Sequence, residues 1–144
     1  MLKISKLTDY GTVVLAYMAR RPDALFSAVC LAQELGLPLS TVRKLLKQMA
    51  GAGLLDSSRG QRGGYRLTRP PQEISLAEVL EALEGPLGVT DCSQAPKLCS
   101  QEAICPIRNN WRGINGVIHG VLRQVSLQQL ASDQRIGVDQ AGGL

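Results

Sequence analysis

Apolar residues recur along the first fifty positions at the three- and four-residue spacing of amphipathic helices. The first helix is predicted over 4–20, before Pro22, and the second follows Ser27 as its cap and ends at Gly36. A third helix follows the turn GLPLS, with Ser40 as its expected cap. The core positions selected by this spacing are Leu7, Tyr10, Val14, Met18, Val29, Ala32, Leu35, Val42, Leu45, Leu46 and Met49.

The third helix, STVRKLLKQMAGAG, carries polar residues around its apolar stripe. Two short helices joined by a glycine-bearing turn, the second basic near its start, are typical of a helix-turn-helix. An ordinary pair of helices with solvated lysines is the alternative on these helices alone. If the segment reads DNA, Ser40, Thr41 and Arg43 are expected near base edges, and Lys44 and Lys47 near phosphates. Gln48 is assigned to the same polar surface.

The next segment, LLDSSRGQRGGYRLTRPP, predicts a strand, a glycine-rich turn and a second strand. Such a hairpin directly after a helix-turn-helix is a wing. Its tip carries Arg59 and Arg62, and Arg59 is expected to enter the minor groove, where negative potential is deep. The glycine run lacks the GK[ST] ending of a phosphate-binding loop, which argues against a nucleotide site.

Two more helices are predicted in the second half of the chain. Ser75 and Glu78 have the spacing of a capping box, and Gly85 with Pro86 ends the helix that they begin. Beyond the cysteines, apolar residues alternate steps of four and three in a heptad-like seam, and SLQQL adds a short helical turn. The seam can pack against a second copy or against the chain's own helices. Its residues are Ile107, Trp111, Ile114, Ile118, Val121 and Val125.

Three of the four cysteines lie in one polar loop, as Cys92, Cys99 and Cys105 with the spacing C-x6-C-x5-C. Structural zinc sites favour the closer C-x2–4-C pairs, while iron–sulfur clusters also use thiolates, usually four per cluster. A cluster, a zinc site and redox-active thiols therefore remain alternatives on spacing alone. Cys30 falls on an apolar phase of the second helix and is interpreted as a small core residue.

Charge divides the 144 residues into two unequal halves. Residues 1–69 carry eleven Lys or Arg against four Asp or Glu, and residues 70–144 carry five against eight. A basic half favours nucleic acid as the partner. No apolar run reaches the length of about 18–20 residues that spans a bilayer, and the N-terminus lacks a signal-peptide core. We therefore expect no membrane contact and a cytoplasmic location, where disulfides are disfavoured. One histidine and no nucleophile–base pair argue against an enzyme.

The chain resembles the winged-helix iron–sulfur transcription regulators of the IscR and NsrR type. The matching segments are LTDYG, LPLSTVRKLL, S-x-R-G-x-x-G-G-Y in the wing, ISLAEVLEALEGP, and three cysteines ahead of a Trp. They run in order from about residue 1 to 130, and within the family the subgroup that controls SUF-type cluster assembly is the most similar. The resemblance implies a mainly α fold: a winged helix-turn-helix with a small β-hairpin wing and a long C-terminal dimerisation helix. The implied parts are a DNA-binding domain over 1–70, a connecting helix over 71–91, a cluster-binding loop over 92–106, the dimerisation helix over 107–130 and a flexible tail over 131–144.

The resemblance also implies that Cys92, Cys99 and Cys105 bind an iron–sulfur cluster in a homodimer that binds an operator in double-stranded DNA. IscR-type members have a histidine as the fourth ligand where this chain has Arg108, which stays protonated and cannot ligate. NsrR-type members use an Asp of the first helix from the partner subunit, a position that Asp9 occupies here. We expect a [2Fe–2S] cluster, with [4Fe–4S] as the alternative. His119 is expected at a surface or interface rather than as a ligand.

These features predict a regulator, acting as a repressor or an activator, that senses cluster status. The residue at the position of Arg43 is acidic in IscR, so the operator sequence is not expected to carry over. A zinc- or thiol-based regulator without a cluster and a small iron–sulfur electron carrier are the alternatives. An electron carrier would need no wing and no recognition helix.

Overall fold

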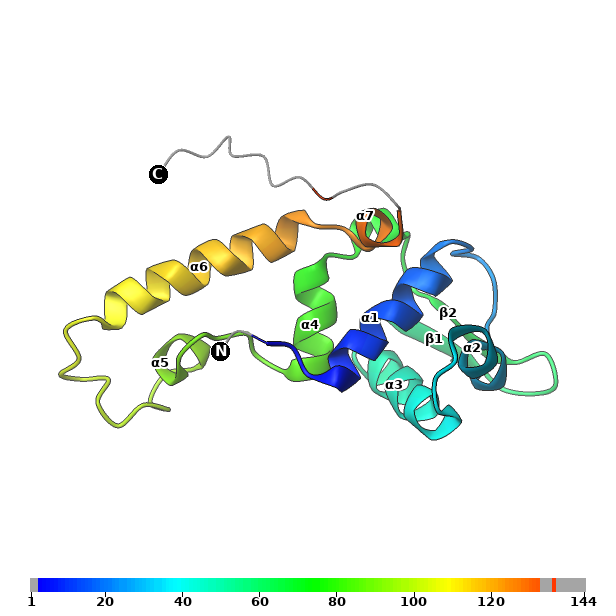
Figure 1. Ribbon diagram of the computed structural model, residues 1–144, viewed down its shortest axis with the longest axis horizontal. Helices are drawn as coiled ribbons and strands as arrows, with labels where there is room; N and C mark the ends of the chain where they lie inside the picture. The colour runs from blue at the N-terminus through cyan, green and yellow to red at the C-terminus, as the bar shows by residue number, and fades with distance from the viewer. Residues whose placement is uncertain (1–2, 133–135, 137–144) are drawn as a thin grey trace.

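The protein is mainly helical, with one small antiparallel hairpin, as the sequence predicted (Figure 1). The structure is a computed structural model that describes residues 3–132 and 136. Its elements are, in order, α1 (Lys6–Ala19), α2 (Ala28–Leu35), α3 (Leu39–Gly51), β1 (Leu55–Ser58), β2 (Gly64–Leu67), the 3-10 turn η1 (Pro71–Glu73), α4 (Leu76–Glu84), α5 (Asp91–Gln94), α6 (Arg108–Gln124) and α7 (Leu127–Ala131).

The core lies where α1, α2 and α3 meet, and the hairpin and α4 cover it. Most of the positions that the three-to-four spacing selected are buried in this core, because that spacing keeps apolar side chains on one face of each helix. The apolar residues with no exposed surface are Val14, Leu15, Met18, Leu31, Val42, Leu45, Leu46, Met49 and Val79.

Helix α2 is turned slightly from the orientation that the sequence suggested, although Ala32 is buried as predicted and Leu35 packs against the core. Val29 was predicted to face inward, but it is 45% exposed, and Leu31 is the buried residue instead. The prediction was wrong because an eight-residue helix offers two similar apolar stripes, and packing against α3 selects between them. The same rotation leaves Cys30 half-buried rather than in the core.

Helix ends follow local chemistry, with one exception. The Ser27 hydroxyl accepts a hydrogen bond from the Cys30 N–H, and Gly36 ends α2 at φ +64°, both as predicted. The capping box of Ser75 and its partner three residues on is also confirmed. Ser40, however, is not the cap of α3. The helix begins one residue earlier, after Pro38, whose fixed φ of −59° suits the entry to a helix.

The wing pairs β1 with β2 in antiparallel register, with Leu55 opposite Leu67. A second connection joins it to the body, because Phe26 and Tyr65 exchange two backbone hydrogen bonds of 2.8 Å. Strand β2 is therefore held against the body, while the tip of the hairpin extends away from it (Figure 1).

Helix α6 lies apart from the body and packs against α4 and α5 (Figure 1). The helix expected over 107–130 is two helices, since α6 ends at Gln124 and α7 begins at Leu127. Between them the chain is extended, and the Leu76 N–H donates to the Val125 carbonyl at 2.7 Å while the Leu127 N–H donates to the Ile74 carbonyl at 2.8 Å. These bonds return the chain to the body, where α7 packs on α1. The tail expected over 131–144 lies mostly outside the described residues.

Candidate nucleic-acid interface and cysteine loop

The outer face of α3 carries most of the residues predicted to meet DNA. Ser40, Arg43, Lys44 and Lys47 are exposed, and Thr41 is half-buried. The opposite face is anchored by four side chains with no exposed surface. A rigid helix with cationic side chains on its free face has the geometry needed to enter a major groove.

Gln48 does not belong to that free face. Its amide donates hydrogen bonds of 3.1 Å to the backbone carbonyls of Ala82 and Leu83, at the end of α4. Helical spacing alone could not distinguish this position from Lys47, because the difference arises only when α4 packs beside α3.

The tip of the wing presents Arg59 and Arg62 to solvent. Glycines make its tight turn. Gly60 has φ +106°, and a Cβ on Gly63 would lie 2.2 Å from the Ser58 carbonyl oxygen. The turn therefore requires glycine at both places and holds two guanidinium groups away from the body.

The cysteine loop begins at a short helix, α5, that buries Cys92. The Thr90 hydroxyl lies 3.2 Å from the Cys92 sulfur, and the Arg112 guanidinium Nε donates to the Cys92 carbonyl at 3.4 Å. Cys99 and Cys105 are half-buried in the irregular stretch that follows, and all three are free thiols.

The three thiols fit an iron–sulfur group by donor chemistry, since free cysteines on one loop are its usual ligands. Within residues 3–132 and 136, however, no three Cys, His, Asp or Glu side chains are grouped closely enough to hold a metal ion. Asp9 is exposed on the first turn of α1. Gathering the thiols around one centre therefore requires the loop to rearrange.

Glu102, between the second and third loop cysteines, fastens the loop to α6. Its carboxylate accepts hydrogen bonds from the Arg112 side chain at 2.5 Å and from the Lys97 N–H at 2.6 Å. Arg108, at 3.9 Å, adds a second cation. Only 14% of the Glu102 side chain is exposed, but 41% of the Arg112 side chain is, so solvent still screens part of this ion pair. Glu102 was not among the residues predicted from the sequence, although its position midway between two cysteines was an available signal.

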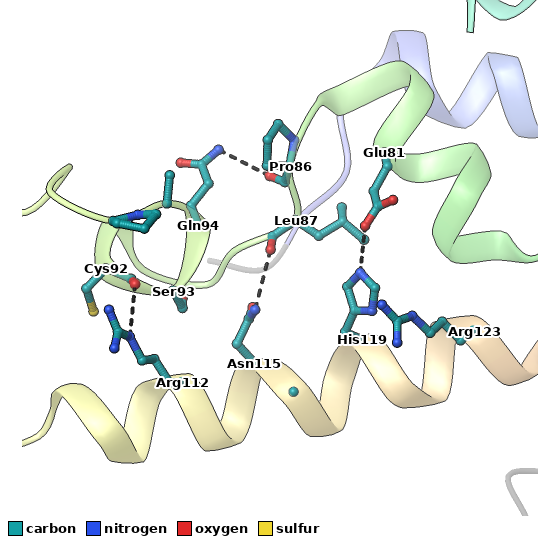
Figure 2. A pocket seen from close by; sticks show the side chains of 13 residues that line it. Glu81, Pro86, Leu87, Cys92, Ser93, Gln94, Arg112, Asn115, His119 and Arg123 are labelled. Carbon is teal, nitrogen blue, oxygen red and sulfur yellow. Dashed lines mark hydrogen bonds and ion pairs between the residues drawn. The ribbon is translucent and has the colours of Figure 1, made fainter. Parts of the chain in front are cut away.

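A cavity of about 650 Å³ lies between the cysteine loop and α6 (Figure 2). Asn115 and His119 point across it from α6. Asn115 accepts from the Val89 N–H at 3.2 Å, and His119 Nε2 lies 2.6 Å from a carboxylate oxygen of Glu81. His119 is therefore engaged with α4, which places it at an interface between helices.

Comparison with known proteins identifies the family. Residues 4–133 match the Rrf2 family, described as iron-dependent transcriptional regulators. The chain belongs to the Rrf2 family. Its function is therefore that of a DNA-binding transcriptional regulator, and the free face of α3 and the wing are the elements that suit this function.

Solved structures of regulators share this Rrf2 fold. CymR, the global cysteine regulator of B. subtilis, is 28% identical, with a TM-score of 0.70 over 94% of this chain and 100% of that one. The oxidised form of Staphylococcus aureus CymR is 27% identical, with a TM-score of 0.69 over 94% and 100%. T. potens IscR is 25% identical, with a TM-score of 0.68 over 90% of this chain and 85% of that one. In the described part of this Rrf2 chain, no helix is long and apolar enough to cross a membrane.

Proposed function

We propose that this Rrf2 regulator binds an iron–sulfur cluster through Cys92, Cys99 and Cys105 and that the cluster controls its affinity for DNA. The observation that carries the proposal is the set of three free thiols on one loop held against α6. The iron-dependent description of the family and the likeness to IscR support the same reading.

The cluster would supply a centre that assembles and is lost with iron supply or oxidation. Asp9 of the partner subunit is the proposed fourth ligand, since Arg108 cannot take that place. Arg108 instead lies near Glu102 and stabilises the loop. A [2Fe–2S] cluster is the favoured form, with [4Fe–4S] as the alternative.

The proposed assembly is a homodimer built on α6. None of the seventeen residues of α6, all of them described, is buried within one protomer. Ile107 is 49% exposed, Ile114 47% and Val117 67%, so this helix leaves apolar surface to be covered. A two-fold pair would present two copies of α3 to half-sites about one helical turn of DNA apart.

In the proposed complex, Ser40, Thr41 and Arg43 approach base edges, Lys44 and Lys47 contact phosphates, and Arg59 enters the minor groove. The proposed targets are genes of SUF-type cluster assembly. The proposed location is the cytoplasm, where thiols stay reduced and available to iron.

The cluster is tested by purifying the protein without air, reconstituting it with ferrous iron and sulfide, and recording absorption and electron paramagnetic spectra. We expect a coloured, iron- and sulfide-containing protein. Cys92→Ser, Cys99→Ser and Cys105→Ser should each lose the cluster, whereas the matched control Cys30→Ser should keep it. Asp9→Ala should retain less cluster and lose it faster. A colourless, iron-free wild type after reconstitution would contradict the proposal.

A thiol-based regulator without a cluster is the second candidate. Its support is the likeness to CymR, one of whose structures is of an oxidised form. This reading predicts that mild peroxide alone changes operator affinity in protein free of iron and zinc. Metal analysis of the same preparations also decides whether zinc occupies the thiols. An electron-carrier role would leave the cationic face of α3 and the wing without a purpose.

The role of the wing is tested by Arg59→Ala, which should weaken operator binding by about 1–3 kcal/mol if the guanidinium contacts the minor groove. Arg20→Ala, an exposed arginine at the end of α1, serves as the control. Gel-shift titration measures both, and an unchanged affinity for Arg59→Ala would remove Arg59 from the interface.

A further inference from the structure

The last turn of α4, residues 81–84, is a junction that contacts three other helices. His119 of α6 pairs with Glu81 at 2.6 Å. Glu84 accepts hydrogen bonds from the Thr8 hydroxyl at 2.6 Å and from the Ser5 N–H at 2.8 Å, at the start of α1. Immediately after this turn, Gly85 at φ +85° leads the chain into the cysteine loop.

The recognition helix is joined to the same turn by Gln48. The final carbonyls of a helix lack partners within it, and two of those of α4 are satisfied by the Gln48 amide. Gln48 follows Lys47 directly and lies one turn beyond Lys44, both on the DNA-facing side. The side chain therefore holds the cationic part of α3 at a set distance from the end of α4.

Helices α1, α3 and α4 pack closely at the junction. A Cβ on Gly11 would lie 2.5 Å from a methyl carbon of Leu83 and 3.3 Å from one of Leu45, so α1, α3 and α4 meet there with no spare space. Packed contacts of this kind shift as units rather than deform continuously. Figure 1 shows α4 standing between α6 on one side and α1 and α3 on the other.

We propose that Gln48 is a positioning residue that couples the cysteine loop to the recognition helix through the last turn of α4. The inference rests on the proposed function, because it names the route by which the state of the loop reaches DNA. A rearrangement of the loop pulls on Gly85, displaces the carbonyls of Ala82 and Leu83, and moves α3 through the two hydrogen bonds. The loop can act on DNA binding only through such a difference between two arrangements.

The decisive variant is Gln48→Met, which keeps the length and neutrality of the side chain and removes its donors. Gln48→Lys restores a donor, and Gln128→Met, at an exposed glutamine of α7, is the matched control. Fluorescence anisotropy gives the affinity for an operator selected from a random DNA pool and for a random duplex of equal length. Each protein is measured after anaerobic reconstitution with iron and sulfide and in the Cys92→Ser/Cys99→Ser/Cys105→Ser background.

We expect Gln48→Met to lower the operator-to-random affinity ratio by about tenfold, the scale of two lost hydrogen bonds, while binding of random DNA stays within about twofold. The difference between reconstituted and cysteine-free protein should disappear in Gln48→Met and return in Gln48→Lys. A purely structural role would instead lower the thermal midpoint and weaken both DNA affinities together.

Hydrogen exchange without DNA provides a readout independent of the operator. In Gln48→Met, amides of the last turn of α4 and of the second half of α3 should exchange about tenfold faster, while those of central α1 keep their rates. An unchanged affinity ratio together with unchanged exchange would overturn the role of Gln48. If the wild type shows no operator preference in either loop state, the proposed function fails, and the exchange comparison alone decides the role of Gln48.

Discussion

Single residues at the ends of helices form hydrogen bonds that join the two halves of this protein. Glu84 is an example, since it ends α4 and binds the first turn of α1. The hydrogen bond from the Thr8 hydroxyl, with a second from the Ser5 N–H, holds the pKa of the Glu84 carboxyl below its ordinary value. The ionised form therefore stabilises the fold above the ordinary pKa, and this stabilisation is lost as the pH falls through the lowered one.

Glu84→Gln should consequently destabilise the protein at neutral pH, by less than about 1 kcal/mol because the carboxylate is exposed to solvent. The difference from wild type should shrink at an acidic pH below the lowered pKa of Glu84, where the carboxyl becomes protonated and its stabilising contribution is lost. Urea unfolding at the two pH values measures this, with the exposed Glu73→Gln as the control. A difference that stays constant across this range would contradict the assigned hydrogen bonds.

At the scale of elements, α6 differs from every other long helix in burying none of its residues within the protomer. Its apolar seam is divided. Ile118 and Val121 are half-buried, whereas Ile107 and Ile114 are about half exposed. Part of the seam thus packs on the chain's own helices, and the remainder is the surface proposed for the second copy.

Ile114→Lys should shift the protein from dimer to monomer, because it places a charge in the proposed apolar interface. Operator affinity should fall with it, since one protomer reaches only one half-site. Asn109→Lys, roughly on the opposite side of α6, is the control for added charge. Sedimentation velocity gives the oligomeric state, and an unchanged dimer with Ile114→Lys would place the interface elsewhere.

For the whole molecule, the cysteine loop and the proposed DNA-binding face of α3 are two sites joined through one packed body. Thermodynamic linkage requires their coupling to be reciprocal. If the reconstituted protein binds the operator more tightly than the cluster-free form by some factor, the operator must favour cluster retention by the same factor.

This reciprocity is measured by titrating reconstituted protein with an iron chelator, anaerobically and at equilibrium, with operator or with random duplex present. We expect the chelator midpoint to move with operator by the factor found in the anisotropy titrations, toward retention if the loaded form binds more tightly and toward loss if it binds less tightly. Suppose instead that the chelator midpoint is the same with operator and with random duplex, while operator affinity depends on the cluster. That result would show that the two measurements do not report one equilibrium.

Local chemistry along the chain was enough to predict the order of the main helices and the hairpin, the buried face of α3 and part of that of α1, the capping residues Ser27 and Ser75 and the glycine-rich wing. These features depend on neighbours within a few positions, so spacing and side-chain type determine them. Tertiary structure alone decided which stripe of α2 faces inward, that Gln48 turns toward α4 rather than solvent, and that Glu102 joins the cysteine loop to α6. Each of these depends on a contact between residues distant in sequence or on packing between helices, and no local pattern contains that information.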